Sequence, residues 1–152
     1  MTPDVIQSLT YLRACIKESF RMYPTASQIA RLTEEPLQVS GGHILPSYSL
    51  VLCHTHVACQ QEENFTQATK FLPERWLSEE RDSDWNHKSN LVLPFGSGKR
   101  ICPGKRLAEQ EIHIIVAKIF RNFQLKPMDD LEIEFNWLMS PTGPLRFQVE
   151  KI

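Results

Sequence analysis

Residues 94–104 read PFGSGKRICPG, and this short stretch decides how the rest of the chain is interpreted. Cys102 stands directly before Pro103, a residue suited to the first position of a helix, so we expect the thiol at a helix N-terminus. The free N–H groups and the dipole of such an end favour a thiolate, and so do the charges of Lys99 and Arg100. The sequence therefore predicts an ionisable cysteine in a tight turn.

Two glycines and one aromatic residue surround this cysteine. Gly98 and Gly104 let the backbone adopt positive φ or pass close to a bulky, flat group, and Phe95 is placed to shield the sulfur from water. A rigid, shielded thiolate is a good axial ligand for a soft or redox-active metal. The alternative is a buried structural cysteine in a glycine-rich loop, which is the usual role of a lone cysteine.

The same stretch does not fit the phosphate-binding loops. The Walker A pattern G-x-x-x-x-G-K-[ST] requires glycine where Leu93 stands and Ser or Thr where Arg100 stands. The dinucleotide pattern G-x-G-x-x-G fails at Ile101. Both nucleotide-binding interpretations are rejected.

The composition is that of a folded protein without general affinity for nucleic acid. The chain has 152 residues, enough for one domain with a core, and 41% of them are hydrophobic and 23% charged. A net charge of −1 gives no attraction to a polyanion, so we expect no nucleic-acid partner. One local basic patch suits an acidic partner and consists of Lys99, Arg100, Lys105 and Arg106.

The cysteines follow no framework of a secreted protein, and we expect reduced thiols. The segment CHTHVAC (53–59) suggests zinc, but a structural zinc site draws ligand pairs from separate segments and no second cluster exists. We interpret its residues as core and surface. No stretch has the apolar length to cross a bilayer, and the first residues do not resemble a signal peptide. The chain is therefore expected to begin inside a larger protein.

Hydrophobic periodicity predicts a mainly α chain with small β-sheets, an α+β fold. One helix is expected from Pro3, with an apolar stripe from Leu9 to Tyr23, and Pro24 ends it. A long helix is expected from Gly104 to Asn122, apolar around much of its circumference and therefore buried.

The strands are expected in three places. LQVSGGHIL is typical of a hairpin turning at Gly41–Gly42, and SLVLCHTH of a strand that runs into a short helix. LEIEF (131–135) and LRFQV (145–149) alternate with period two and predict a terminal β-pair joined through SPTGP. Residues 60–90 are expected to be irregular around the apolar segment FLPERWL.

Every fixed position of the pattern F-x-x-G-x-R-x-C-x-G is matched, by Phe95, Gly98, Arg100, Cys102 and Gly104. This pattern resembles the haem-binding signature of the cytochrome P450 family, the haem-thiolate monooxygenases. The resemblance implies haem b (iron protoporphyrin IX) as cofactor, Cys102 as the axial ligand of its iron, and Arg100 as partner of a propionate. Arg31, ten residues after Arg21, is a candidate for the second propionate.

Two further motifs follow the family order. Glu18 and Arg21 form E-x-x-R, and Arg75 lies in FLPERW. Alone, a pair three residues apart on a helix is most often a solvated ion pair worth little. The resemblance implies instead a buried network of these three residues that holds the core beside the haem, favourable only if every charge is paired.

A second feature is similar to mitochondrial members of the family. Arg13 and Lys17 form a basic pair on the first helix, and GKRLAEQE adds Lys105 and Arg106. The alternative is an ordinary solvated face. The resemblance implies that these residues dock an adrenodoxin-like [2Fe–2S] ferredoxin as electron donor, and that the protein lies peripherally on the mitochondrial inner membrane.

The resemblance also implies a substrate pocket. TASQI and MSPTG would line it as loops, with the candidate contacts Ala26, Ser27, Ile29, Met139 and Thr142. FNWLMSPTGPLRF is similar to arthropod mitochondrial members that hydroxylate ecdysteroid precursors. We therefore expect O₂ and an apolar, steroid-like substrate.

The chain departs from the family in two ways. PSYS stands at 46–49 where P-x-G-T is common, which affects a turn and not the haem site. Family members are several times longer, so residues 1–152 are expected to be the C-terminal portion of one catalytic domain, without the oxygen-activating helix. The rival hypotheses are a non-catalytic chain that keeps only the docking surface, and a partial gene model.

Overall fold

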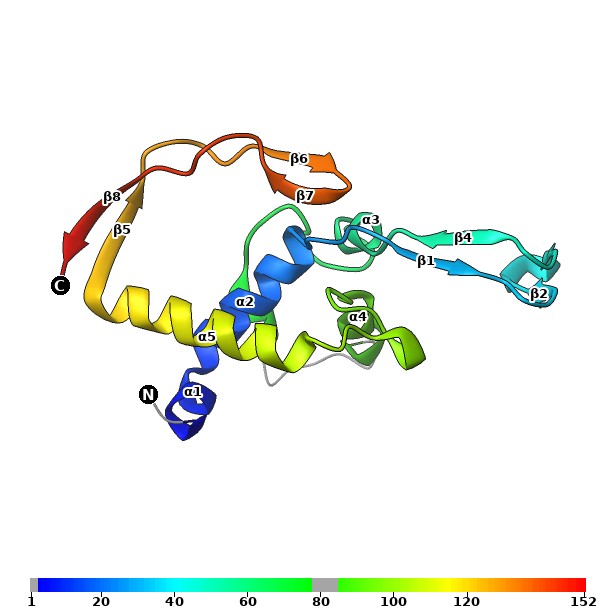
Figure 1. Cartoon of the computed structure of the whole chain (residues 1–152), viewed down its shortest axis with the longest axis horizontal. Helices are drawn as coiled ribbons and strands as arrows, with labels where there is room; N and C mark the ends of the chain where they lie inside the picture. Colours follow the sequence, from blue (N-terminus) through cyan, green and yellow to red (C-terminus); the bar gives the residue numbers. More distant parts are fainter. Residues whose placement is uncertain (1–2, 78–84) are drawn as a thin grey trace.

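The computed structural model describes residues 3–77 and 85–152 and shows two crossing helices with β-hairpins extending from them (Figure 1). The helices are α1 (Pro3–Ser8), α2 (Thr10–Met22), α3 (Thr55–Cys59), α4 (Trp85–Leu91) and α5 (Lys105–Asn122). Short 3₁₀ turns are η1 (Ser40–Gly42), η2 (Pro73–Trp76) and η3 (Gly98–Arg100). The strands are β1 (Ile29–Leu32), β2 (Leu37–Gln38), β3 (Ile44–Leu45), β4 (Leu50–Cys53), β5 (Phe123–Pro127), β6 (Ile133–Asn136), β7 (Leu138–Pro141) and β8 (Phe147–Lys151). The prediction of a chain that mixes helices with small antiparallel sheets is confirmed.

The first predicted helix is two helices, with a break at Leu9. The Ser8 hydroxyl donates to the Val5 carbonyl oxygen at 2.8 Å, which is the acceptor that the Leu9 N–H would use in a continuous α-helix. The Leu9 N–H donates instead to the Ile6 oxygen at 3.3 Å. The prediction of one continuous helix was therefore wrong, whereas its end before Pro24 is confirmed.

The hairpin around the paired glycines is confirmed. β2 pairs with β3, and Gly41 and Gly42 have φ of 80° and 79°, a conformation that costs a side-chain-bearing residue energy. β1 pairs with β4 between this tip and the helices, and Ile29 is the register partner of Cys53 (Figure 1). The predicted strand and short helix are β4 and α3.

Two elements differ from the prediction in the middle and at the end of the chain. α4 lies in the segment expected to be irregular, because its mostly polar sequence WNHKSNL carries no apolar stripe. β5 pairs with β8, and β6 pairs with β7 through a turn at Trp137, so the predicted pairing of LEIEF with LRFQV was wrong. Alternation identifies a strand but does not identify its partner.

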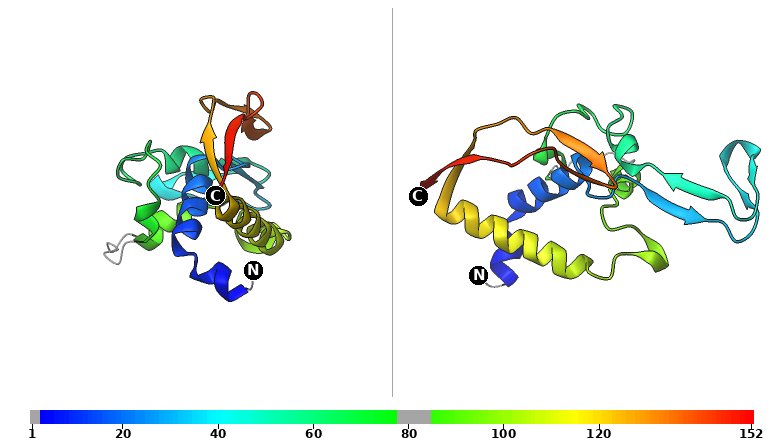
Figure 2. Two further views of the ribbon diagram at one scale, coloured as in Figure 1. Left: turned by 90° about the vertical axis from the view of Figure 1, so that its left-hand side faces the viewer. Right: turned by 45° about the horizontal axis from the view of Figure 1, so that its top comes forward.

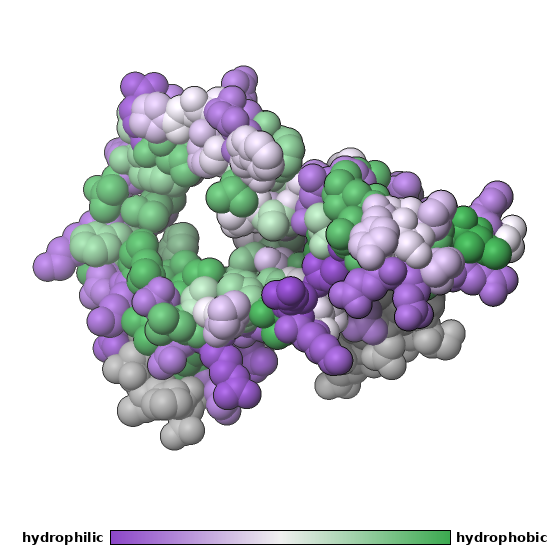
Figure 3. Space-filling model, turned by 45° about the vertical axis from the view of Figure 1, so that its right-hand side comes forward, coloured by the Kyte–Doolittle hydropathy of each residue, from purple (hydrophilic) through white to green (hydrophobic). Residues whose placement is uncertain are grey.

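The core is small and lies where α2 meets η2 and α3. Its buried cluster consists of Ala14, Cys59, Phe65, Ala68 and Trp76. The prediction that α5 is buried was wrong, because in α5 the structure buries Ala117 while Ile115 is 56% and Phe120 58% exposed. The β5–β8 ribbon and the β6–β7 hairpin arch away from α5, and hydrophobic side chains border the hollow between them (Figures 2 and 3). Within the described residues, no helix combines the length and the apolar character needed to span a membrane.

Candidate functional site

The backbone around Cys102 is fixed from both sides. Its N–H donates to the Phe95 carbonyl oxygen at 2.9 Å, and its carbonyl oxygen accepts from the Lys105 N–H at 3.3 Å. The side chain is exposed and forms no disulfide. α5 begins at Lys105 with Gly104 as N-cap, so the prediction of Pro103 as the first helical residue was wrong. The thiol lies just outside the first turn of the helix.

Glycine is required in this loop, and it leaves room beside the cysteine. Gly96 and Gly98 have φ of 75° and 71°, the left-handed region that favours glycine. A Cβ at Gly98 would meet no atom within 4 Å, so one side of the loop is open. Gly104 has an ordinary φ of −81°, and a Cβ there would lie 3.8 Å from the Cys102 sulfur.

Two arginines from different elements lie at the Cys102 loop (residues 94–104). Arg100 lies in η3, and Arg31 lies on β1, far away in sequence. The Arg31 Nη2 donates to the Ser97 carbonyl oxygen at 3.4 Å, and its Nη1 donates to the Ala30 oxygen at 2.8 Å. Both side chains are exposed. The structure thus brings Arg31 next to the Cys102 loop.

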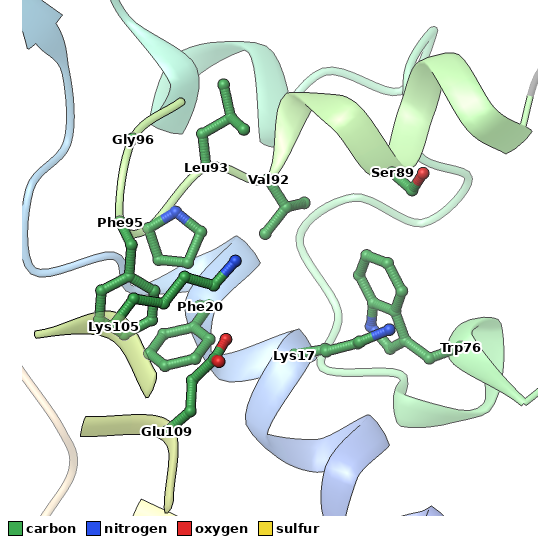
Figure 4. Close-up of a pocket in the computed structure, with 11 residues that line it drawn as sticks. Lys17, Phe20, Trp76, Ser89, Val92, Leu93, Phe95, Gly96, Lys105 and Glu109 are labelled. Atoms are coloured by element: carbon green, nitrogen blue, oxygen red, sulfur yellow. The ribbon is translucent and has the colours of Figure 1, made fainter. Parts of the chain in front are cut away.

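Residues 93–96, at the start of the loop, border a cleft of about 190 Å³ (Figure 4). Phe20 of α2 and Phe95 of the loop meet edge to face in it, with ring centroids 5.5 Å apart and planes at 79°. Lys105 and Glu109 project from α5 at the same place, and Lys17 extends toward Trp76. Sequence reasoning missed Phe20, because only three-dimensional proximity distinguishes it from any apolar residue of α2.

Glu18 lies at the centre of a buried polar network. Its Oε1 accepts from the Arg21 Nη2 at 2.9 Å, the Arg75 Nε at 3.1 Å and the Leu72 N–H at 3.0 Å. Its Oε2 accepts from the Arg21 Nε at 3.0 Å and the Trp76 indole N–H at 2.9 Å. Glu18 and Arg21 are both 0% exposed, so the pair is not the solvated ion pair weighed as the alternative.

One carboxylate meets two arginines in this network, and backbone carbonyl oxygens accept the remaining arginine donors. Arg21 also donates to the Cys59 oxygen at 2.6 Å, and Arg75 donates to the Thr66 oxygen at 3.0 Å. Burial by itself raises the pKa of Glu18, but the hydrogen bonds from Arg21, Leu72 and Trp76 outweigh it and hold that pKa below its ordinary value. The carboxylate is therefore ionised and fully paired. Sequence reasoning named the segment of Trp76 but missed its indole as a donor.

The four predicted docking residues lie on two neighbouring helices. Lys17 and Lys105 line the same cleft, and Arg13 and Lys17 line a second hollow beside Trp76. The Lys17 ammonium lies 5.6 Å from the centroid of the Trp76 ring. Arg106 is exposed on α5.

The two segments predicted to contact substrate lie side by side. The Met139 N–H donates to the Thr25 carbonyl oxygen at 2.9 Å, which joins β7 to the segment that contains Ala26 and Ser27. Both segments had been predicted to be loops. Residues 25–28 and Thr142 lie outside the strands, as predicted, but Ile29 begins β1 and Met139 lies on β7, so the prediction was wrong for these two residues.

The CHTHVAC segment has its side chains in different environments. Cys53 is exposed at the end of β4, whereas Cys59 is buried, and burial raises the pKa of its thiol to about 11. The buried His56 Nδ1 has no hydrogen-bond partner among residues 3–77 and 85–152. Burial, and after it the charge of Arg21, lowers the pKa of this histidine. In the described ranges, no three His, Cys, Asp or Glu side chains are placed to hold a metal ion together.

Residues 1–150 match the family model described as cytochrome P450. The chain belongs to the cytochrome P450 family. It is 38% identical over 148 residues to the ecdysone 20-monooxygenase of Drosophila melanogaster, covering 96% of this chain and 27% of that protein. It is 36% identical over 130 residues to the mitochondrial 1,25-dihydroxyvitamin D(3) 24-hydroxylase of Mus musculus, covering 85% and 24%. Cytochrome P450 CYP12A2 of Musca domestica is 34% identical over 158 residues, covering 95% and 29%.

The chain spans 24–29% of the length of these three P450 relatives. Membership of the family implies a haem cofactor. The residues present fit one. Cys102 offers an exposed, unpaired thiol, the Gly98 side of its loop is open, and Arg31 and Arg100 stand exposed nearby as cations for carboxylates.

Proposed function

We propose that this chain is the C-terminal portion of a single P450 catalytic domain, and that the complete protein is a haem-dependent monooxygenase. The observation that carries this proposal is the Cys102 loop. A free, exposed thiol lies beside open space, with its backbone held at both the N–H and the carbonyl oxygen. The family match over residues 1–150 supports the same conclusion.

The residues of this chain bind and orient the cofactor. Cys102 Sγ would ligate the iron of haem b, and Arg100 and Arg31 would bind its propionates. When bound, the haem would supply the iron at which O₂, two electrons and two protons are consumed, so that one oxygen atom enters a C–H bond of the substrate and the other leaves as water. The sulfur of Cys102 would donate electron density to that iron.

The substrate is apolar and steroid-like, of the class of ecdysteroid precursors. Ala26, Ser27 and Ile29 on one segment, and Met139 and Thr142 on the other, contact it. The hydrogen bond between Met139 and Thr25 supports a shared pocket wall. The names of two relatives, an ecdysone monooxygenase and a hydroxylase of a vitamin D compound, support the substrate class.

The electron donor is a [2Fe–2S] ferredoxin of the adrenodoxin type. Its acidic surface is met by basic residues of α2 and α5, namely Arg13, Lys17, Lys105 and Arg106. Lys17 and Lys105 line a cleft that borders the Cys102 loop. This position beside the proposed iron ligand supports their role in docking an electron donor. The protein lies peripherally on the mitochondrial inner membrane; the name of one relative supports the organelle.

A second candidate function is a chain that keeps only the docking surface. The four proposed docking residues all lie within the described part of this chain, which favours it. Ferrous–CO spectra of the chain alone and of the complete polypeptide, each expressed with haem, separate the two. We expect the red-shifted thiolate band from the complete polypeptide and not from the chain alone, where half of the haem pocket is missing.

The ligand assignment is tested in the complete polypeptide by Cys102→Ser. This variant should lose the thiolate band, because a serine hydroxyl is not a soft anionic ligand. Cys53→Ser, at another exposed cysteine, is the matched control and should keep the band. Survival of the band in Cys102→Ser would remove the assignment.

A further inference from the structure

We propose that Phe20 is a positioning residue for the Cys102 loop, through which the Glu18 network holds the candidate iron ligand in place. The proposal rests on the proposed function, because it concerns a loop that is assigned to haem. It adds a contact that the sequence motifs do not contain, since Phe20 lies at an unspecified position inside E-x-x-R.

The first observation is the contact of Phe20 with Phe95. Their rings meet edge to face at 5.5 Å and 79°, a preferred geometry of aromatic pairs, and both rings are half-buried. Figure 4 shows the pair between the end of α4 and the start of α5. A T-shaped pair fixes the angle of each ring as well as its distance, so Phe20 orients Phe95.

The second observation joins Phe95 to the ligand. The carbonyl oxygen of Phe95 accepts the N–H of Cys102 at 2.9 Å, and Gly96, with φ of 75°, turns the chain between them. The ring that Phe20 touches and the oxygen that holds Cys102 therefore belong to one residue. A displacement of Phe95 as a whole moves the carbonyl oxygen that accepts from the backbone of Cys102.

The third observation is that Phe20 projects from a fixed turn of α2. Glu18, two residues earlier, accepts five hydrogen bonds and is 0% exposed, and Arg21, one residue later, is also 0% exposed. The backbone on both sides of Phe20 is thus immobilised by the buried network. The contact of Phe20 with Phe95 therefore restrains the loop as well.

The test uses the complete, haem-loaded polypeptide with Phe20→Leu, which keeps an apolar side chain but removes the edge-to-face contact. Phe20→Tyr retains the ring and is the rescue variant, and Phe135→Leu, at a phenylalanine of β6 that is 56% exposed, is the control. The readouts are haem transfer to apomyoglobin, the reduction potential and the melting temperature.

We expect Phe20→Leu to lose haem about tenfold faster, the lower end of what supporting residues contribute at metal sites. Its reduction potential should rise, because water that enters beside Phe95 favours the ferrous state, which carries one more negative charge. Phe20→Tyr and Phe135→Leu should match the parent in both readouts.

The proposal is overturned if Phe20→Leu matches the parent in haem transfer and potential. It is also overturned if only the melting temperature falls, because Phe20 would then be a packing residue. These outcomes are independent of the ligand assignment, which stands or falls with the band of Cys102→Ser.

Discussion

At the scale of single residues, Glu18 has the most demanding environment. It is a carboxylate without solvent contact that forms ion pairs with two arginines. Glu18→Gln keeps the shape but removes the charge, which leaves Arg21 buried and unpaired. We expect the free energy of unfolding of the complete polypeptide to fall by about 3–5 kcal/mol.

Urea denaturation followed by tryptophan fluorescence measures this loss. Glu35→Gln, at an exposed glutamate, is the control and should change stability by less than about 0.5 kcal/mol. A loss below about 1 kcal/mol in Glu18→Gln would mean that the network is not buried in the complete protein.

His56 makes the stability of the fold depend on pH, and the direction of this dependence is defined. Its pKa is lowered in the fold by burial and by the charge of Arg21, so below about pH 6.5 the unfolded chain binds a proton that the folded chain does not. Its contribution to stability is therefore complete above about pH 6.5 and is lost as the pH falls toward the folded pKa.

We expect His56→Gln to flatten the decline of stability just below about pH 6.5. Melting temperatures measured in steps across that range check this, with His43→Gln, at an exposed histidine of the β2–β3 turn, as the control. An unchanged slope in His56→Gln would contradict the burial of this ring.

Motifs predicted the residues named by the family pattern, but not their neighbours in space. Cys102, Glu18, Arg21 and Arg75 stand at fixed spacings that can be read along the chain. Trp76 as a donor and Phe20 as a ring partner follow only from the way that α2 meets η2 and the cysteine loop. No local pattern specifies such a crossing.

At the scale of elements, the turn at Trp137 stores backbone strain. Trp137 has φ of 66°, outside the range that side-chain-bearing residues prefer, and its side chain is 89% exposed. Trp137→Gly removes the strain, whereas Trp137→Ala retains it, and both remove the same exposed ring. We expect the glycine variant to be the more stable by about 1 kcal/mol.

Thermal unfolding of the two variants in parallel measures this difference directly. If the alanine variant proves equal or better, the turn between β6 and β7 does not adopt the left-handed conformation in solution.

Which elements could be predicted depended on whether their signal is local. The glycines of the β2–β3 hairpin and the long apolar pattern of α5 are local signals, and both elements exist. The pairing of β5 with β8 joins residues twenty or more positions apart, and β6 and β7 form their own hairpin between them. The break at Leu9 coincides with the hydrogen bond of the Ser8 hydroxyl to Val5, a local feature that periodicity does not register.

At the scale of the whole molecule, an apolar groove of about 630 Å³ runs between α2 and α5. Its lining is almost entirely hydrophobic and includes Leu12, Ile16, Ile112, Val116 and Phe120. Contiguous apolar surfaces of this kind are covered in soluble proteins or mark contact sites. The proposed longer polypeptide supplies a cover, and this explains why α5 is apolar in sequence yet exposed in the isolated chain.

This explanation predicts opposite effects of one substitution in two settings. Val116→Glu places a charge in the groove. In the complete polypeptide, where we expect the groove to be covered, it should cost several kcal/mol of stability because the charge is buried without a partner. In the isolated chain it should instead reduce the binding of a hydrophobic dye and the self-association seen by light scattering.

Lys118→Glu, at an exposed position of α5, is the matched control and should leave both settings near the parent. If the complete polypeptide tolerates Val116→Glu as well as Lys118→Glu, the groove is open to solvent there too, and the exposure of α5 belongs to the protein as a whole.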